Sequence, residues 1–214
     1  PAGISAEDTV PKSASEQFSY ALGFQIGTQI ARQMMAEGLD LDPGHLAQAI
    51  EDVLSGAPPA MTQAEMDASI TAIQQQSQEK SMEKVKAAEQ AGQEFRQTYR
   101  DQDGVSETES GILYRVLTPG TGGQPKIDDT VVVHYRGTLV DGTEFDSSIR
   151  RGQPATFSLG GIIPGWQEAL QLMHEGALWE VVIPPELAYG ETGAGGAIGP
   201  QETLIFEIEL IEVK

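Results

Sequence analysis

The sequence contains no cysteine among its 214 residues, so it forms no disulfide and offers no thiol for catalysis, and the redox compartment is left open. Basic residues are few as well, because 13 Lys and Arg against 32 Asp and Glu give a formal net charge of -19. Phosphate binding needs clustered lysine and arginine, so this composition argues against a nucleic-acid partner. No stretch approaches the run of about eighteen apolar residues that a membrane-spanning helix requires.

Metal and cofactor sites are also missing from the sequence pattern. The three histidines, His45, His134 and His174, are far apart and do not have the spacing of metal ligands. The glycine-rich segment 191–199 is not followed by a lysine, so it does not match a phosphate-binding loop. We therefore predict neither a metal nor a cofactor, and we assign the histidines to the surface or to packing.

The first sixty residues predict two helices with clear ends. Ser13 and Glu16 have the spacing of a capping box, which predicts a helix from there to about Glu37, ending at Gly38. Asp42 and the proline after it predict a second helix, with Gly56 just past its end. Apolar side chains recur every four residues along the first helix and form a single stripe: Phe18, Leu22, Ile26, Ile30 and Met34.

Two helices of this size make too small a core to be stable alone. Residues 1–60 are therefore predicted to be a helical dimerisation domain, in which two copies bury both apolar stripes together. Gly23 and Gly27 lie beside the stripe, where they either allow two helices to cross closely or are simply tolerated.

Residues 61–104 are predicted to be a long connecting helix. Thr62 and Glu65 form a second capping box, and no proline follows before Tyr99. About 37 residues at 1.5 Å each give a rod on the order of 55 Å. Its middle, residues 74–80, is polar all round, which is typical of a helix that crosses solvent; a coiled coil is the alternative. Phe95 and Tyr99 are expected to fasten its far end to the next domain.

The remaining residues, 105–214, predict an α+β domain. A polar junction at 101–109 precedes segments that read as strands at 111–117, 130–139, 156–159, 179–183 and 203–213. Pro164 opens the only helix expected here, with Trp166, Leu170 and Met173 on one face. We expect an antiparallel β-sheet wrapped around this one short helix.

The stretch 131–166 gathers aromatic rings, branched aliphatic side chains and one carboxylate, Asp146. It has no serine–histidine pair of the kind that nucleophilic catalysis uses. An apolar pocket with a single acid suits the binding of an apolar group and the easing of a rotation, not bond cleavage. An ordinary core is the alternative, but an unpartnered aspartate does not belong in one. The glycine-rich segment 191–199 is interpreted as a mobile flap beside such a site.

Several dispersed motifs in this half, in the right order, resemble the FKBP family of peptidyl-prolyl cis-trans isomerases. They are His134-Tyr135, Asp141-Gly142, Phe145-Asp146-Ser147-Ser148, Ile162-Ile163 with Gly165-Trp166, Ala188-Tyr189-Gly190 and Leu204-Ile205-Phe206. The helical front half resembles the macrophage infectivity potentiator (Mip) group of bacterial FKBPs. By this resemblance residues 105–214 are an FKBP-like isomerase domain that rotates X–Pro bonds of protein substrates and assists folding.

The resemblance also implies the residues of the site. The expected catalytic residues are Tyr135, Phe145, Asp146, Ile163, Trp166, Tyr189 and Phe206, and the expected substrate-binding residues are Phe157, Ile162 and Ile198. Trp166 would be the floor of the pocket, and the Ile163 amide and the Tyr189 hydroxyl would anchor substrate carbonyls. The chain departs from many relatives at Ala155 and Ala194, two changes that thin the pocket rim.

Expected partners are proline-containing polypeptides, macrolide inhibitors of the tacrolimus and rapamycin type, and a second copy of the chain. Similarity to exported Mip-type proteins, and a chain that starts at Pro1 and not at methionine, favour the periplasm or outer membrane of a Gram-negative bacterium over the cytoplasm. The alternative function is a dimeric chaperone or peptide-binding module whose pocket mainly docks clients.

Rotation of a peptide bond has a barrier of about 18–20 kcal/mol, whereas cis and trans X–Pro bonds differ by only about 0.5–1 kcal/mol. The protein must therefore act on the barrier, and a dry aromatic pocket would do so by disfavouring the planar, more polar amide. Asp146 either interacts with the rotating carbonyl or holds Tyr135 through a hydrogen bond. The second role is favoured, because a free carboxylate in an apolar pocket is costly.

Overall fold

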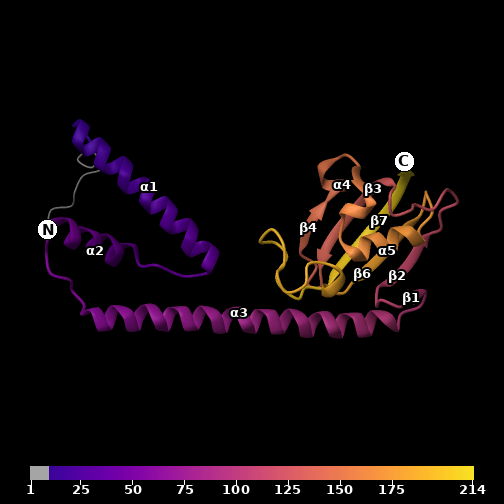
Figure 1. Ribbon diagram of the computed structural model, residues 1–214, viewed down its shortest axis with the longest axis horizontal. Helices are drawn as coiled ribbons and strands as arrows, with labels where there is room; N and C mark the ends of the chain where they lie inside the picture. Colours follow the sequence, from indigo (N-terminus) through magenta and orange to yellow (C-terminus); the bar gives the residue numbers. More distant parts are fainter. Residues whose placement is uncertain (1–9) are drawn as a thin grey trace. The chain divides into compact units, whose positions relative to one another are not determined.

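The computed structural model describes residues 10–214, so the first nine residues of the predicted dimerisation domain lie outside it (Figure 1). The described residues divide into two units at the boundary between Ser81 and Met82, and the two units are considered separately.

The N-terminal unit contains the two predicted helices and the first half of a third. They are α1 (Ala14–Glu37), α2 (Pro43–Ser55) and α3 (Gln63–Arg100). The predicted capping box is confirmed, since Glu16 N–H donates to Ser13 Oγ and the Glu16 carboxylate accepts from the Ser13 amide. Gly38 ends α1 in the left-handed conformation that glycine adopts easily. Local side-chain chemistry therefore fixes these helix ends.

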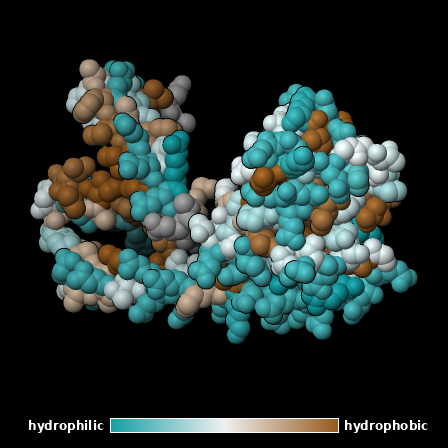
Figure 2. Space-filling model, turned by 45° about the vertical axis from the view of Figure 1, so that its right-hand side comes forward, coloured by the Kyte–Doolittle hydropathy of each residue, from teal (hydrophilic) through white to brown (hydrophobic). Residues whose placement is uncertain are grey.

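The apolar residues of these helices remain exposed in the single chain. No described residue of α1 is buried, and α2 has no buried residue either. Phe18 and Phe24 are 69% and 67% exposed, and Val53 on α2 is 79% exposed. Figure 2 shows hydrophobic side chains gathered over this unit. The unit thus has no core of its own within one chain.

The C-terminal unit is built on one antiparallel sheet in the order β1-β2-β6-β7-β3-β4, with β5 also paired to β3. The strands are β1 (Val105–Glu107), β2 (Leu113–Thr118), β3 (Thr130–Leu139), β4 (Glu144–Ser147), β5 (Ala155–Ser158), β6 (Leu178–Ile183) and β7 (Leu204–Val213). The predicted alternation along β7 is confirmed, since Leu204, Phe206, Ile208 and Leu210 are all buried. These inward-facing side chains form one wall of the core.

The predicted central helix is α5 (Pro164–Leu172), which lies against the sheet (Figure 1). Trp166, Leu170 and Met173 are buried, as their shared face predicts. The helix starts so close to β6 that a side chain at Gly165 would meet Ile183, with Cδ1 only 2.9 Å from the added carbon. The sheet wraps this helix, so the predicted α+β domain, an antiparallel sheet around a central helix, is confirmed.

Two local expectations are wrong. The polar junction contains a strand, β1, because Val105–Glu107 pairs with Leu113–Arg115 of β2. Pro164 also does not open the only helix of this half, since α4 (Ser148–Arg151) follows β4 and the 3₁₀ turns η2 (Leu159–Gly161) and η3 (Pro185–Leu187) are present. Elements of three or four residues are too short to produce a periodic apolar pattern.

The far end of α3 belongs to this second unit and is fastened to the sheet as predicted. Phe95 and Tyr99 pack on Leu113 and Val182. The Tyr99 hydroxyl donates to the Glu180 carboxylate (2.7 Å), which also accepts from Arg115 (2.6 Å). Burial, together with this carboxylate, raises the pKa of Tyr99.

Candidate active site

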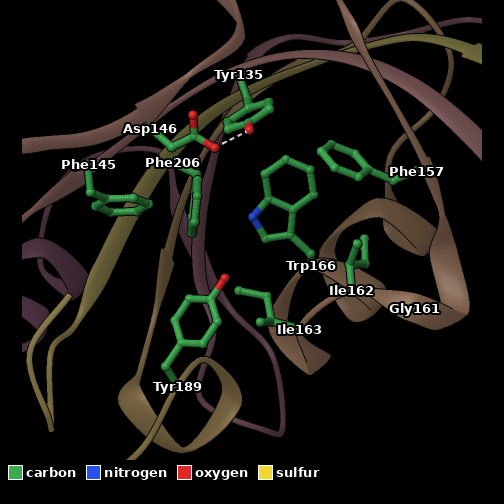
Figure 3. Close-up of a pocket in the computed structure, with 10 residues that line it drawn as sticks. All are labelled: Tyr135, Phe145, Asp146, Phe157, Gly161, Ile162, Ile163, Trp166, Tyr189 and Phe206. Atoms are coloured by element: carbon green, nitrogen blue, oxygen red, sulfur yellow. Dashed lines mark hydrogen bonds between the residues drawn. The ribbon is translucent and has the colours of Figure 1, made fainter. Parts of the chain in front are cut away.

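A cavity of about 300 Å³ opens between α5, β3, β4, β7 and the loop after η3 (Figure 3). Most of the predicted site residues line it: Tyr135, Phe145, Asp146, Phe157, Ile162, Ile163, Trp166, Tyr189 and Phe206, joined by Gly161. Residues from 135 to 206 in the sequence therefore converge on one space.

Trp166 lies in the middle of a group of aromatic rings packed edge to face. Its ring centroid is 5.2 Å from those of Tyr135 and Phe206 and 5.7 Å from that of Phe157, with interplanar angles between 84° and 89°. Phe145 contacts Phe206 in the same way at 5.6 Å. Edge-to-face contacts fix each ring by its neighbour. The result is an apolar surface with a set shape, as expected of a pocket that orients a ring.

One predicted substrate-binding residue lies elsewhere. Ile198 is buried in the main hydrophobic core and does not line the cavity. Its backbone pairs with Ala194 across the glycine-rich loop, with N···O distances of 2.8 and 3.0 Å. Its predicted contact with substrate stays a prediction, whereas its place in the structure is that of a residue that packs the loop onto the domain.

The carboxylate of Asp146 has the hydrogen-bond partners that an acid in an apolar pocket needs. It accepts from the Tyr135 hydroxyl (Figure 3). It also accepts from Arg151 Nη1, and its own neighbour Ser147 donates a backbone N–H at 2.8 Å. Arg151 Nη2 also donates to the Tyr135 oxygen (2.9 Å), and the guanidinium lies 5.5 Å from the centre of the Tyr135 ring. This geometry fits the role in which Asp146 holds Tyr135.

Two opposing effects set the ionisation of Asp146. Burial alone would raise the pKa of its carboxyl, but the hydrogen bonds from Tyr135 and Arg151, the positive charge of Arg151 and the Ser147 amide together bring this pKa below its ordinary value. The pKa of Tyr135 moves in the opposite direction, because burial and the carboxylate both disfavour the phenolate. At neutral pH the site therefore holds a charged carboxylate and a neutral tyrosine.

From the sequence, no role in the site was predicted for Arg151, or for Ser148, which was named only as part of a motif. Arg151 lies on α4, a helix too short for any periodic pattern to predict. A signal was present nevertheless, because a carboxylate in an apolar pocket needs a nearby cation, and Arg150 and Arg151 follow Asp146 within five positions. Ser148 is fully buried, and its Oγ accepts the Tyr135 backbone N–H at 2.7 Å. These two residues fix the ring and the backbone of Tyr135 respectively.

We expect Asp146→Asn to lower the free energy of unfolding at neutral pH by about 1 kcal/mol, which is below the roughly 1.5–3 kcal/mol of hydrogen bonds to a buried charged group because this carboxylate is partly exposed. A lowered pKa stabilises the folded state above the unfolded value near pH 4, and this stabilisation is lost as pH falls through the folded value. Urea unfolding of the unmodified protein and of Asp146→Asn at several pH values should thus show a difference in unfolding free energy at neutral pH. This difference should disappear below about pH 4.

Tyr135→Phe supplies the partner for a double-mutant cycle. If the carboxylate and the hydroxyl act as a pair, the two substitutions together should cost less than the sum of the single ones. The assignment of Asp146 as the residue that holds Tyr135 would be contradicted by two results together: a stability difference that does not change with pH, and single substitutions whose effects add up.

Comparison with known proteins agrees with this geometry. The family described as FKBP-type peptidyl-prolyl cis-trans isomerase matches residues 122–211, which include every residue that lines the cavity. A second family, the domain amino terminal to FKBP-type peptidyl-prolyl isomerase, matches residues 15–116.

Relatives match nearly the whole chain. The outer membrane protein MIP of Legionella longbeachae is 43% identical over 90% of this chain and 84% of its own length. The FKBP-type 22 kDa peptidyl-prolyl cis-trans isomerase of Escherichia coli is 43% identical over 92% and 94% respectively. The crystal structure of FkpA from Escherichia coli superposes with a TM-score of 0.69 at 36% identity, covering 96% of this chain and 99% of that one.

The chain belongs to the FKBP-type peptidyl-prolyl cis-trans isomerases, enzymes that accelerate rotation about the bond before proline. Within that family it falls in the bacterial group of Mip and FkpA, and it carries a domain ahead of the isomerase domain. The predicted family, enzyme class and fold are confirmed, and the alternative of a module that only docks clients is not favoured.

Proposed function

We propose that isomerisation takes place in the cavity around Trp166, and that the residues predicted from the sequence and found in its lining carry the activity. The observation that supports this most strongly is the convergence of six aromatic rings and one partnered carboxylate on a single apolar space of about 300 Å³. The proline ring of a substrate packs on these rings, which orients the preceding amide before it rotates.

The proposed mechanism needs no covalent step. As the amide twists, it loses resonance, and its carbonyl carries less charge separation than in the planar form. An apolar wall made by Phe145, Trp166 and Phe206 disfavours the planar form more than the twisted one, so the barrier falls. The Tyr189 hydroxyl and the Ile163 backbone amide anchor substrate carbonyls on either side of the rotating bond.

Tyr189→Phe tests the role of the hydroxyl. One hydrogen bond contributes about 0.5–1.5 kcal/mol, so we expect kcat/KM to fall by about threefold to tenfold in a protease-coupled assay on a proline-containing peptide. Tyr114→Phe is the matched control, because Tyr114 stacks on Trp179 outside the cavity and its variant should keep the activity of the unmodified protein. Equal activity of all three proteins would remove Tyr189 from the site.

The same variants separate isomerisation from chaperoning. If the cavity serves isomerisation alone, Tyr189→Phe should suppress the aggregation of an unfolded client protein to the same extent as the unmodified protein. Parallel loss of both activities would instead assign client docking to the cavity.

We further propose the division into residues 1–60 for dimerisation, 61–104 as connecting helix and 105–214 as isomerase domain, with homodimers formed through the N-terminal helices. The exposed apolar side chains of α1 and α2 support this, since a unit with no buried residue in these helices needs a partner to form a core. A hollow of about 540 Å³ beside α2, lined in part by Val53, Met61 and Met66, adds apolar surface for that partner.

Macrolides of the tacrolimus and rapamycin type are proposed ligands of the same cavity, since its aromatic lining suits a large apolar ring. Tacrolimus should then inhibit peptide isomerisation competitively. We also propose a periplasmic or outer-membrane location, supported by the name of the Legionella longbeachae relative. In residues 10–214 no helix is both long and apolar enough to cross a membrane.

A further inference from the structure

The last turns of α3 make direct contact with the start of β7. Gly92 and Tyr99 are the buried residues of α3. A side-chain carbon added at Gly92 would overlap Thr203 Oγ1 and lie 3.1 Å from Thr203 Cβ, so this helix position accommodates only glycine without a shift of its neighbour. Arg96, one turn further along, donates to the same Thr203 oxygen. Thr203 itself is fully buried.

Thr203 ends the loop that carries Tyr189. Two positions before it, Gln201 has a φ of 60°, the only positive value found among non-glycine residues of the described chain. Such a residue is strained and keeps this conformation only when its surroundings hold it. Its backbone N–H donates to the Gly190 carbonyl at 2.8 Å. The downstream side of Tyr189 is therefore tied, through Gln201, to the residue that α3 contacts.

The upstream side of Tyr189 is held by the same turn. The Pro185 carbonyl, in η3, accepts the Gly190 N–H at 2.8 Å. Gly190 is therefore bonded to Pro185 on one side and to Gln201 on the other, which joins the turn that presents Tyr189 to the end of the loop that α3 contacts. Among these residues only Tyr189 lines the cavity.

We propose that Arg96 and Thr203 are positioning residues for the isomerase site: by bracing the Pro185–Thr203 segment, the end of α3 holds the Tyr189 hydroxyl at the cavity. The inference rests on the role proposed above for Tyr189. It makes the last two turns of the connecting helix a working part of the isomerase domain and not only a tether to it.

Arg96→Ala in the full-length protein tests the proposal, with Arg100→Ala as matched control. Arg100 lies one turn further along the same helix and pairs with exposed Glu107 at 2.6 Å, so its loss removes the same charge without touching Thr203. Coupling of this kind changes a distant site by about twofold to thirtyfold. We expect Arg96→Ala to lower kcat/KM by that factor, Arg96→Lys to restore part of it, and Arg100→Ala to leave it unchanged.

A direct readout of Tyr189 distinguishes positioning from a general loss of stability. The protein has five tyrosines, so labelling with 3-fluorotyrosine should give five ¹⁹F signals, and Tyr189→Phe identifies the one of interest. The Tyr189 signal should shift in Arg96→Ala and in Gly92→Ala, the variant that adds one methyl group against Thr203, and should stay in place in Arg100→Ala.

An unmoved Tyr189 signal and unchanged kcat/KM in folded Arg96→Ala would overturn the proposal. A shifted signal with no change in kcat/KM would overturn it too, because Arg96 would then position a residue without consequence for the reaction. If Tyr189→Phe itself kept full activity, the proposed role of Tyr189 would fail separately, and that outcome is visible in the same set of assays.

Discussion

Gly137→Ala should lower kcat/KM for proline-containing peptides by about fivefold to 150-fold, which corresponds to the 1–3 kcal/mol that overpacking a tight site costs. Gly137 lies on β3, and a side-chain carbon there would be 2.6 Å from Phe145 Cζ and 2.8 Å from Phe206 Cε1. Both rings line the cavity. One added methyl group must therefore push two walls of the pocket out of place, and the protease-coupled assay measures the consequence.

Gly161→Ala is the control for this substitution. Gly161 also lines the cavity, but a side-chain carbon added there meets no atom within 4 Å. The control should therefore keep nearly all of the activity. If Gly137→Ala were as active as Gly161→Ala while remaining folded, the two phenylalanine rings would not form the surface on which the substrate reacts.

Val53→Asp should convert the proposed dimer into a monomer. A central apolar side chain of an interface contributes about 2 kcal/mol, and a two-fold symmetric dimer loses it twice, so the dissociation constant should rise about a thousandfold. Val53 is chosen because it is largely exposed on α2 and lines the apolar hollow there. Sedimentation over a range of micromolar concentrations measures the change.

Met82→Asp controls for the added charge, since Met82 is an exposed apolar residue of α3 outside the predicted dimerisation domain. It should sediment as the unmodified protein does. If the unmodified protein sedimented as a monomer at micromolar concentration, the proposed homodimer would be contradicted. The exposed apolar helices would then need another partner.

The elements that the sequence predicts well are those whose signals are local. Ser13, Asp42 and Thr62 cap their helices through bonds to residues three positions away, so the pattern and the contact lie within one turn. The face of α5 and the alternation of β7 follow in the same way from periods of 3.6 and 2 residues.

Contacts between distant segments could not be predicted in this way. Arg151 contacts Tyr135 because the four-residue helix α4, which follows β4, returns the chain to β3. Glycine is needed at position 92 because Thr203, 111 positions later, contacts that face of α3. The cavity lining itself came from resemblance to a family, since no spacing rule brings Phe145, Tyr189 and Phe206 together. Ile198 is the one residue of that set which the structure packs in the core and not in the cavity lining, and its contact with substrate stays a prediction.

Exchange NMR of an X–Pro peptide with a small amount of protein, recorded in H₂O and in D₂O, tests most directly whether a water-poor aromatic cavity turns the amide without any covalent or proton-transfer step. The unmodified protein should produce cis–trans exchange peaks whose rate is the same in both solvents, and Gly137→Ala should lose them. A marked slowing in D₂O, as general acid–base catalysis produces, or exchange that survives displacement of the Phe145 and Phe206 rings, would contradict it.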